Sequence, residues 1–512
     1  MMQIRKKTLD RATEQAINQA ASAGIPLAFD RYEDMVPACG FGRMGLDCKA
    51  CTQGPCRINP FDPSNGTVCG RDREGLAAAS FLRLIADGAV ANASYAGVEA
   101  RVAGALFEGI SLANEGTASA AQLLQKAVDV ATVAYQSLPG RAGNAVRQVE
   151  VGLGAAKPDK INILLLGSLT SAGAGKIAAQ LSADPRVNVV GAAGGEVAGT
   201  AIAGNYNSEE ALLVTNAIDG AVVGKSCVSP GFLGLASQQG VPVVDEANFD
   251  ATSLLDRADA HFRLNNGRNL SARLSPARAT VGFTAASFKK ITAAEWKSLA
   301  GAGIRGVALL GGCNNAATTQ DGVVVRQAQE LLKNDVLIVA SGCAAIGLAK
   351  AGYMDPARRG SFTSQGLDSF LAGFSRACGS EMPAALEAGT CWEMPAALEL
   401  ARLLSQKLGV PMVASMPEAS RPAAWSNALA VAAQGVRSYV GPILPLDGGL
   451  ETVSTLNDAL GARGGALVGP GQIGEPEAIV ARLLFAGVSS EQLAVTGGMG
   501  RVSVYNSVGS KQ

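Results

Sequence analysis

Short apolar segments alternate with helical segments along the chain from about residue 160 onward. INILLLGS at 161–168 is followed by the helical sequence SAGAGKIAAQLS, then VNVVGAAGG, a helix over 208–216, and GAVVGKSC. The same alternation begins again with the apolar segment IRGVALLGGC at 304–313, and further apolar segments follow at 335–343, 409–417 and 436–445. Alternation of short buried strands with helices predicts doubly wound parallel sheets.

The chain before residue 158 has a different pattern. Residues 1–35 predict an amphipathic helix that ends near 24–26, and 71–151 is Ala-rich and helical with almost no strand signal. The more polar stretch 243–300 is expected to link two α/β units. The predicted fold class is therefore α/β, with a helical amino-terminal domain at 1–157 followed by doubly wound α/β domains at 158–300 and 301–512. The duplicated heptapeptide EMPAALE, at 381–387 and 393–399, is too short to count as a structural repeat.

Composition narrows the range of functions. The 512 residues include 43 Lys and Arg and 43 Asp and Glu, so no basic field invites nucleic acid or anionic lipid. This favours a small molecule or a protein as the partner. No apolar run reaches the roughly 18 to 20 residues of a membrane span, and the charged start does not resemble a signal peptide. We therefore expect a cytoplasmic, reducing location, where the ten cysteines are metal ligands rather than disulfides.

Five cysteines gather in one Gly- and Pro-rich loop, residues 39–69. Four of them have the spacing C-x2-C-x4-C-x12-C, namely Cys48, Cys51, Cys56 and Cys69. A loop with little side-chain bulk can wrap a cuboidal cluster and direct its amides at the sulfurs, so the spacing favours a [4Fe-4S] cluster. A zinc site, which pairs two short knuckles, and unmetallated thiols are the alternatives.

Three further cysteines share one position type. Cys227, Cys313 and Cys343 each follow an apolar strand-like run, in AVVGKSC, VALLGGC and LIVASGC. Ligands of open α/β sheets bind at such strand ends, so these residues could converge on one object between the two units, with Cys391 as a fourth member. The alternative is that they are small buried hydrophobic residues, as free cysteines often are.

Several motifs together resemble the nickel–iron carbon monoxide dehydrogenases, relatives of the hybrid-cluster proteins. They are C-x2-G-x2-G-x2-C-x2-C-x4-C-R at 39–57, GNY through DGAVVGKSC at 204–227, GGCNN, VLIVASGCAAIGLAKAG, GTC at 389–391 and SMPE at 415–418. The resemblance spans about residues 38–445. It implies a homodimer of subunits with a helical domain and two Rossmann-like domains. It also implies a [4Fe-4S] cluster per subunit, a cluster shared across the dimer axis, and a buried nickel–iron–sulfur centre that interconverts CO and CO2.

The resemblance carries the cluster ligands over unevenly. The loop cysteines Cys48, Cys51, Cys56 and Cys69 match the cluster of each subunit. For the shared cluster the chain offers Cys39, but Asp47 stands where a second cysteine belongs. Two Cys39 and two Asp47 across the axis could still hold a cluster, because a carboxylate oxygen can ligate iron. The alternative is a lost or solvent-ligated cluster with Asp47 in water.

At the active centre, Cys227, Cys313, Cys343 and Cys391 match four ligands of the family. A histidine ligand falls at or beside Ser168, and a cysteine ligand falls at Ala192 or Ala193. These two ligands hold the iron outside the cubane in the family, so their absence argues against a nickel–iron pair. The family's lysine aligns with Ala423, and its helical histidines align with residues 92–95. The groups that handle protons are therefore missing as well.

Three other residues have possible roles. Glu196 resembles the position at which hybrid-cluster proteins use a carboxylate ligand to iron. Cys378 matches no family ligand and is expected to be a packed core thiol rather than a substitute ligand. His261 is the only histidine of the chain, and a structural or solvated role is favoured over ligation.

The sequence therefore predicts a homodimeric iron–sulfur oxidoreductase with an altered central cluster and weak or no CO oxidation. A ferredoxin-like electron-transfer protein is the expected partner, with a small molecule as the substrate if there is one. One alternative is a non-enzymatic electron carrier or redox sensor. Another is a hybrid-cluster-like reductase of small nitrogen oxides that uses Glu196. A fold shared with a family does not by itself fix the function when the site has changed.

Overall fold

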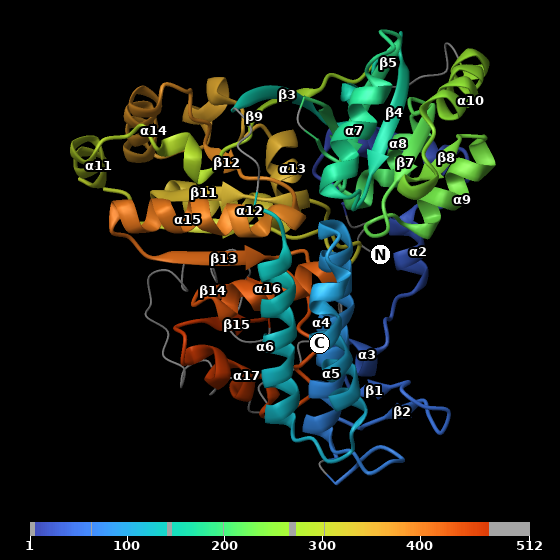
Figure 1. The fold of residues 1–512 in the computed structure, drawn as a ribbon, viewed down its shortest axis with the longest axis vertical. Helices are drawn as coiled ribbons and strands as arrows, with labels where there is room; N and C mark the ends of the chain where they lie inside the picture. The colour runs from blue at the N-terminus through green and yellow to red at the C-terminus, as the bar shows by residue number, and fades with distance from the viewer. Residues whose placement is uncertain are drawn as a thin grey trace, which may run out of the picture.

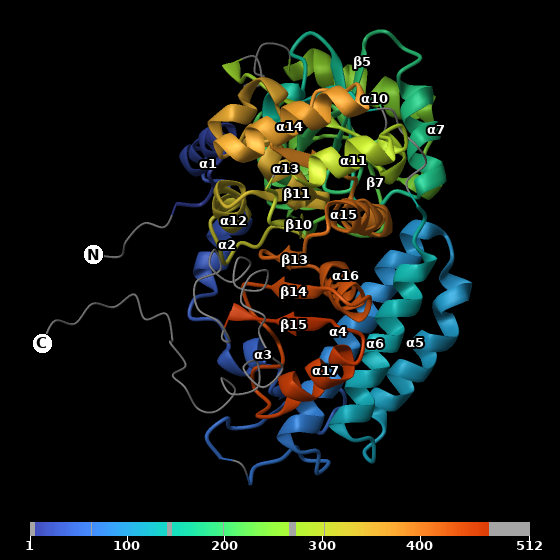
Figure 2. The ribbon, with the colours of Figure 1, turned by 90° about the vertical axis from the view of Figure 1, so that its left-hand side faces the viewer.

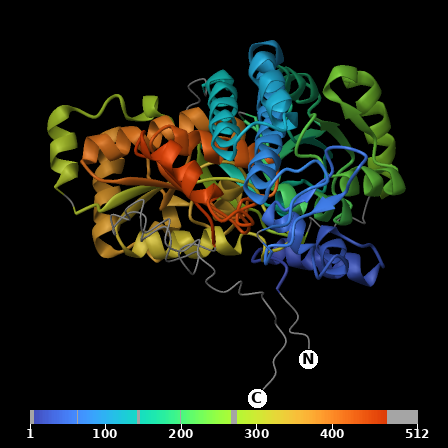
Figure 3. The same ribbon diagram turned by 90° about the horizontal axis from the view of Figure 1, so that it is seen from below.

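Long helices and two large, mainly parallel sheets make up most of the molecule (Figure 1). The computed structural model describes residues 6–62, 64–140, 146–197, 199–265, 273–301 and 303–470. Seen from below, the first α/β unit (green) and the second (yellow to red) lie on opposite sides, with the blue amino-terminal helices between them (Figure 3). The predicted fold class, a helical amino-terminal part followed by two doubly wound α/β units, is confirmed.

The amino-terminal segment forms two helices rather than the one predicted. The side chain of Asp10 caps α1 (Arg11–Ser22) by accepting from the N–H groups of Ala12 and Thr13. The chain then turns at Gly24, whose φ of 68° lies in the left-handed region, and begins α2 (Ala28–Asp34). A short helix, α3 (Gly40–Met44), introduces the cysteine loop.

A helical bundle follows, made of α4 (Arg73–Ala96), α5 (Glu99–Asn114) and α6 (Ala120–Ser137). A fourth helix from the far end of the chain, α16 (Pro422–Ala433), packs on α4 and α6. Gly88 permits this approach, because a Cβ at that position would stand 2.2 Å from the carbonyl oxygen of Pro422. The bundle is thus fastened to the second α/β unit.

Helix α4 bears on the prediction that the chain has no membrane span. It is the one helix in the described ranges that is long and apolar enough to cross a membrane. About two thirds of its most apolar window, 67%, is buried inside the protein. Packing against α5, α6 and α16 therefore accounts for its apolar residues.

The first sheet has seven strands in the order β8-β7-β4-β5-β6-β3-β9. The six residues of β4 are all buried, as expected of a central strand covered on both faces. All strand pairs are parallel except β3 with β9. The strands are β3 (Arg147–Val151), β4 (Ile161–Leu166), β5 (Val187–Ala192), β6 (Ala201–Gly204), β7 (Gly220–Val223), β8 (Val243–Asp245) and β9 (Ala277–Val281). Its helices are α7 (Ser171–Leu181), α8 (Glu209–Val214), α9 (Pro230–Gln239) and α10 (Ala251–Asn265).

Two expectations about this region are wrong. Residues 147–151 form a strand inside a segment predicted to be helical, because β3 finds its partners β6 and β9 only in the folded chain. Residues 243–300 are not a mere link, since they supply β8, α10 and β9 to the first sheet and its cover. Their polar sequence reflects positions at the sheet edges, where fewer residues are buried. The domain boundaries at 157 and 300 stay a prediction.

The second sheet has six parallel strands in the order β12-β11-β10-β13-β14-β15, and Figure 2 shows β11, β10, β13, β14 and β15 stacked one above another. They are β10 (Gly306–Leu310), β11 (Val336–Ala340), β12 (Ala385–Glu387), β13 (Met412–Met416), β14 (Arg437–Val440) and β15 (Ala466–Val468). The other helices are α11 (Ala293–Ala300), α12 (Gly322–Lys333), α13 (Gly342–Lys350), α14 (Gln365–Cys378), α15 (Met394–Leu408) and α17 (Thr452–Gly461). Residues 471–512 of the predicted second α/β domain lie outside the described residues.

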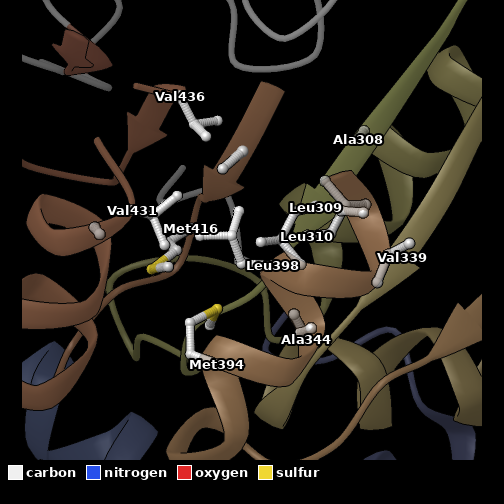
Figure 4. Packing of buried hydrophobic residues seen from close by; sticks show 14 of the residues in the cluster. Ala308, Leu309, Leu310, Val339, Ala344, Met394, Leu398, Met416, Val431 and Val436 are labelled. Atoms are coloured by element: carbon white, nitrogen blue, oxygen red, sulfur yellow. The ribbon is translucent and has the colours of Figure 1, made fainter. Parts of the chain in front are cut away.

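The largest apolar core lies between this sheet and its helices (Figure 4). Leu309 and Leu310 of β10 are fully buried, and Met394 and Met416 fill the space beside them. A Cβ on Gly311 would stand 3.1 Å from the methyl carbon of Met394, so the chain turns beneath these side chains on its way to Cys313. The packed core thus fixes the position of the loop that follows β10.

Candidate metal centres

The loop cysteines surround a two-strand hairpin. In it, β1 (Asp47–Cys48) pairs antiparallel with β2 (Cys56–Arg57), which places Cys48 directly opposite Cys56. The chain between the strands carries Cys51 and turns at Gly54, where a Cβ would stand 2.9 Å from the amide nitrogen of Cys56. The glycine of the motif therefore has a steric reason, because the backbone folds back on itself between three candidate ligands.

Hydrogen-bond donors and cations accompany these thiols. The Thr67 hydroxyl lies 3.2 Å from the Cys69 sulfur, and this hydrogen bond lowers the pKa of the Cys69 thiol. A backbone hydrogen bond from Arg71 and the charge of its side chain lower the same pKa further. Cys51 and Cys69 are exposed, and Cys48 and Cys56 are half-buried. Thiolates supported by donors at the rim of the molecule suit a cluster that exchanges electrons with a partner.

Cys39 and Asp47 lie on either side of α3. Cys39 is exposed and forms the N-cap of that helix. The carboxylate of Asp47 lies against Gly42 in the middle of α3, with Lys49 3.4 Å away as its ion-pair partner. The two candidate ligands of the shared cluster are thus held by one short helix, and ligation across a dimer axis stays a prediction.

The four central cysteines come together from both α/β units. Each follows a parallel strand: Cys227 after β7, Cys313 after β10, Cys343 after β11 and Cys391 after β12. Their exposed fractions are only 4%, 6%, 5% and 6%. Gly342, with a φ of 65°, permits a close approach, because a Cβ there would lie 3.1 Å from the Cβ of Cys391. The convergence that the strand-end positions suggested is therefore present.

Electrostatic coupling shows that these thiols are neighbours. Burial raises the pKa of Cys227, Cys343 and Cys391 well above the usual range of a thiol, and the charges of the other central cysteines add to the effect. Cys313 is among the neighbours that shift all three. If the four thiols were only buried hydrophobic residues, nothing would require them to lie together. A bound metal would stabilise them together as thiolates.

The arrangement fits a cluster better than a single ion. In the described part of the chain, no group of three or more His, Cys, Asp or Glu side chains surrounds one common metal position. A cubane takes one cysteine on each of its irons, so its four thiols stand farther apart than ligands of one zinc ion. Four thiolates are the ligand set of such a cluster, and its binding here stays a prediction.

Local backbone geometry constrains two of the central cysteines. Cys227 has a φ of 57°, which a residue with a side chain seldom adopts and which the surrounding loop must enforce. The backbone N–H of Tyr206 donates to the sulfur of Cys343 at 3.4 Å. Amide donors of this kind tune the potential of a cluster.

A cavity of about 270 Å³ is lined in part by Gly342 and Thr390, the residues that precede Cys343 and Cys391 in the chain. Glu196, Glu387 and Glu393 line it together with Tyr95. The carboxylate of Glu196 accepts from the N–H of Gly194 at 3.0 Å. Burial, together with the charges of the other two glutamates, raises the pKa of Glu196 to about 7. Glu196 thus lies close enough to Cys343 and Cys391 to influence both, although it was singled out by resemblance alone.

Known proteins match this chain over most of its length. The model of the Prismane/CO dehydrogenase family matches residues 142–471. The chain belongs to this family. Carbon monoxide dehydrogenase 2 of Carboxydothermus hydrogenoformans is 24% identical over 89% of this chain and 93% of its own length. Carbon monoxide dehydrogenase 1 of the same organism is 26% identical, with 88% and 94% covered.

A solved structure supports the fold of this family member. Carbon monoxide dehydrogenase IV from Carboxydothermus hydrogenoformans superimposes with a TM-score of 0.81, covering 96% of this chain and 99% of that chain at 21% identity. The chain is therefore a carbon monoxide dehydrogenase/prismane family oxidoreductase in its fold and its sequence relationships.

Ser168, Ala192 and Ala193 are the residues at which the resemblance places two further ligands of the family. The Ser168 hydroxyl accepts from the N–H of Ser226 at 2.8 Å, and the N–H of Ser168 donates to the carbonyl of Ser226 at 2.9 Å. Ser168 therefore braces the loop that leads to Cys227. Ala192 and Ala193 are buried and carry no ligating atom.

Neutral groups occupy the positions to which the resemblance assigns the family's acid–base groups. Ala423 packs in one apolar cluster with Cys227 and Cys391. Asn92 donates to the side-chain oxygen of Asn427 at 3.0 Å, and Asn427 in turn donates to the carbonyl of Cys391 at 2.9 Å. Carboxamide side chains do not ionise near neutral pH, so this chain of hydrogen bonds orients Cys391 without acting as an acid or a base.

The two remaining residues lie away from the central thiols. Cys378 ends α14 half-buried, with its sulfur 3.6 Å from the carbonyl of Ser380, as expected of a packed thiol. His261 is buried between Asp219, 3.2 Å away, and Asn265, 2.9 Å away, at the opposite end of β7 from Cys227. Both contacts support a structural role.

Arg421 is a residue that sequence reasoning missed. It precedes α16, and its guanidinium carbon lies 5.6 Å from the centre of the Tyr206 ring. The charges of Cys227 and Cys313 are among those that raise its pKa. The resemblance drew attention to Ala423, two residues later, and no spacing rule points to Arg421.

Proposed function

We propose that this chain is an iron–sulfur oxidoreductase whose central cluster lacks the additional iron of its family, so that CO oxidation is weak or absent. Cys48, Cys51, Cys56 and Cys69 would hold one [4Fe-4S] cluster in each subunit. The central cysteines would hold a second cluster through thiolates alone. The observation that carries the proposal is the packing of Ala423 against Cys227 and Cys391, where an acid–base group is expected.

The chemistry of CO explains why these changes matter. Its oxidation needs a Lewis-acidic metal pair and a group that accepts protons. A cubane with full thiolate ligation supplies electron transfer when it is bound. Ser168, Ala193 and Ala423 offer neither a histidine or cysteine ligand for a further metal nor a base. Asn92 and Asn427 are hydrogen-bonded to each other, and their amides do not ionise near neutral pH.

The loop cluster would be the route for electrons into and out of the protein. Its cysteines are exposed or half-buried, so a ferredoxin-like electron-transfer protein could come close to it. A homodimer, with Cys39 and Asp47 of both subunits at a shared cluster, would join two such routes. A cytoplasmic location fits these oxygen-sensitive groups.

Metal analysis tests the proposal directly. Protein purified without oxygen from nickel-supplied cells is analysed for iron and nickel, and anomalous diffraction locates each metal. We expect iron and no nickel at the central cysteines, and CO-dependent reduction of a viologen dye at the background level of cluster-free protein. Nickel at this site with nickel-dependent CO oxidation would overturn the proposal.

A pair of cysteine variants provides the control. Cys313→Ser removes a candidate central ligand, and we expect it to lower the iron content by about four atoms per chain. Cys378→Ser removes another thiol outside both centres and should leave the iron content unchanged. Equal iron in both variants would show that the central thiols bind no cluster.

Glu196 favours one second candidate, a hybrid-cluster-like reductase of small nitrogen oxides. The residue adjoins a cavity large enough for such molecules and lies near Cys343 and Cys391. Glu196→Gln should then abolish reduction while the loop cluster keeps its spectrum. Glu393→Gln, which removes a charge from the same cavity, should retain activity. If neither the wild-type protein nor the Glu393→Gln variant reduces a small nitrogen oxide, and both clusters have full thiolate ligation, an electron carrier or sensor is the better description.

A further inference from the structure

Arg421 packs on the ring of Tyr206, a residue that contacts the central site. Its guanidinium carbon lies 5.6 Å from the centre of the Tyr206 ring, a cation–π distance. The backbone N–H of Tyr206 donates to the sulfur of Cys343. Arg421 also forms the N-cap of α16, which is anchored on α4 by the close contact at Gly88. The guanidinium therefore has a defined place beside the thiols.

Arg421 lies close enough to Cys227 and Cys313 for their charges to act on it. Burial acts to lower its pKa, but the charges of Tyr206, Cys227, Cys313 and Glu209 outweigh burial and raise it. In the described ranges no carboxylate oxygen lies within ion-pair distance of Arg421. The nearest acid named, Glu209, accepts instead from the N–H of Ser229 at 2.9 Å, and burial raises its pKa well above the usual range. The positive charge is therefore largely uncancelled.

Other charges around the site have the opposite sign or are neutralised. Glu196 acts on Cys343 and Cys391 from the cavity. Lys350 also lies near Cys343, but Asp321 holds it in an ion pair of 2.7 Å. Glu196 thus acts on Cys343 and Cys391, whereas Arg421 lies near Cys227 and Cys313.

We infer that Arg421 is a positioning residue whose fixed charge raises the reduction potential of the central cluster. The inference rests on the proposed function, because it requires a cluster on Cys227, Cys313, Cys343 and Cys391. Reduction adds one negative charge to a site that already has four thiolates. A buried cation nearby stabilises the reduced form more than the oxidised form, since charges interact strongly away from water.

The test is a redox titration of the anaerobic holoprotein, in which the loop cluster serves as the internal reference. Arg421→Gln removes the charge, and Arg421→Met removes it while retaining an apolar contact with Tyr206. At a fixed solution potential, we expect the ratio of reduced to oxidised central cluster to fall about tenfold in both variants. The reduced fraction of the loop cluster should not change. Arg421→Lys keeps the charge and should restore most of the wild-type ratio.

A matched control separates charge at this site from a general effect. Arg358 lies 5.3 Å from the ring of Phe362 in another cation–π pair, in the turn Pro356–Ser361. Arg358→Gln therefore removes the same kind of charge and contact but should leave the central ratio unchanged.

The possible failures can be told apart. A central cluster whose reduced fraction is the same in wild type, Arg421→Gln and Arg421→Met would overturn the inference and leave the proposed function intact. A wild-type protein with a loop cluster and no central cluster would overturn both. If Arg421→Gln fails to assemble its clusters, Arg421→Met and Arg421→Lys decide the question.

Discussion

Removing one partner of the buried ion pair between Lys350 and Asp321 should strongly destabilise the second α/β unit. The two atoms of the pair are 2.7 Å apart, and the side chains are only 4% and 3% exposed. Asp321 also accepts from the amide groups of Asn205 at 2.8 Å and Asn314 at 2.9 Å. Asn205 comes from the first α/β unit, so the pair also connects the two units.

We expect Lys350→Met to destabilise the protein by about 3–5 kcal/mol, because it leaves the carboxylate of Asp321 buried without a cation. The double variant Lys350→Met with Asp321→Asn removes both charges and should recover most of this loss. The charge of Asp321 raises the pKa of Lys350 although burial acts to lower it. The stabilisation by Lys350 is therefore complete below pH 10.5, the usual pKa, and is lost only as the pH rises through the raised value.

Urea unfolding followed by tryptophan fluorescence measures this effect. The chain has three tryptophans, Trp296, Trp392 and Trp425, and all are buried around the second sheet. The assay therefore reports the unit that contains the ion pair. A loss below about 1 kcal/mol for Lys350→Met at pH 7, or an equal loss for the single and double variants, would refute the reasoning.

Three other predictions concern packing, pH and metal content. Gly88→Ala directs a Cβ at the carbonyl of Pro422, so we expect a loss of about 1–3 kcal/mol in the same assay. Gly104→Ala, at an open position of α5, should instead stabilise by up to about 1 kcal/mol, and equal effects would contradict the packing argument. Burial raises the pKa of Glu418 to about 8, so the folded state retains a proton that the unfolded chain releases above pH 4.5. Stability should fall as the pH rises between these values, and Glu418→Gln should flatten this slope in unfolding measured across that range. Cys56→Ser should remove about four irons and the loop-cluster EPR signal while the central iron remains, whereas loss of iron from both centres would show that the clusters depend on each other.

The strand ends explain why much of the central site could be predicted. Cys227, Cys313 and Cys343 follow apolar runs that form β7, β10 and β11, and the carboxyl ends of parallel strands lie at one edge of a sheet. Spacing likewise identified the loop cysteines, because all four lie within one short segment. Local patterns suffice where a site is built at the ends of regular elements or within one loop.

Edge strands and long-range contacts could not be predicted in the same way. The strands β3 and β9 have weak local signals and exist because they pair with each other across 126 residues or more of chain, from Val151 to Ala277. The approach of Arg421 to Tyr206 likewise joins two units that no spacing rule relates.

The two copies of the heptapeptide EMPAALE show which features the sequence decides and which the tertiary structure decides. The copy at 381–387 ends in strand β12, which pairs with β11, whereas the copy at 393–399 lies in helix α15. Identical residues thus adopt different structures, because one copy finds an open sheet edge and the other continues into a long amphipathic segment. The sequence alone determined the α/β class and the family, which depend on local periodicity and on short motifs. The tertiary structure decided which charges face the central thiols, since those contacts form only when separate units pack together.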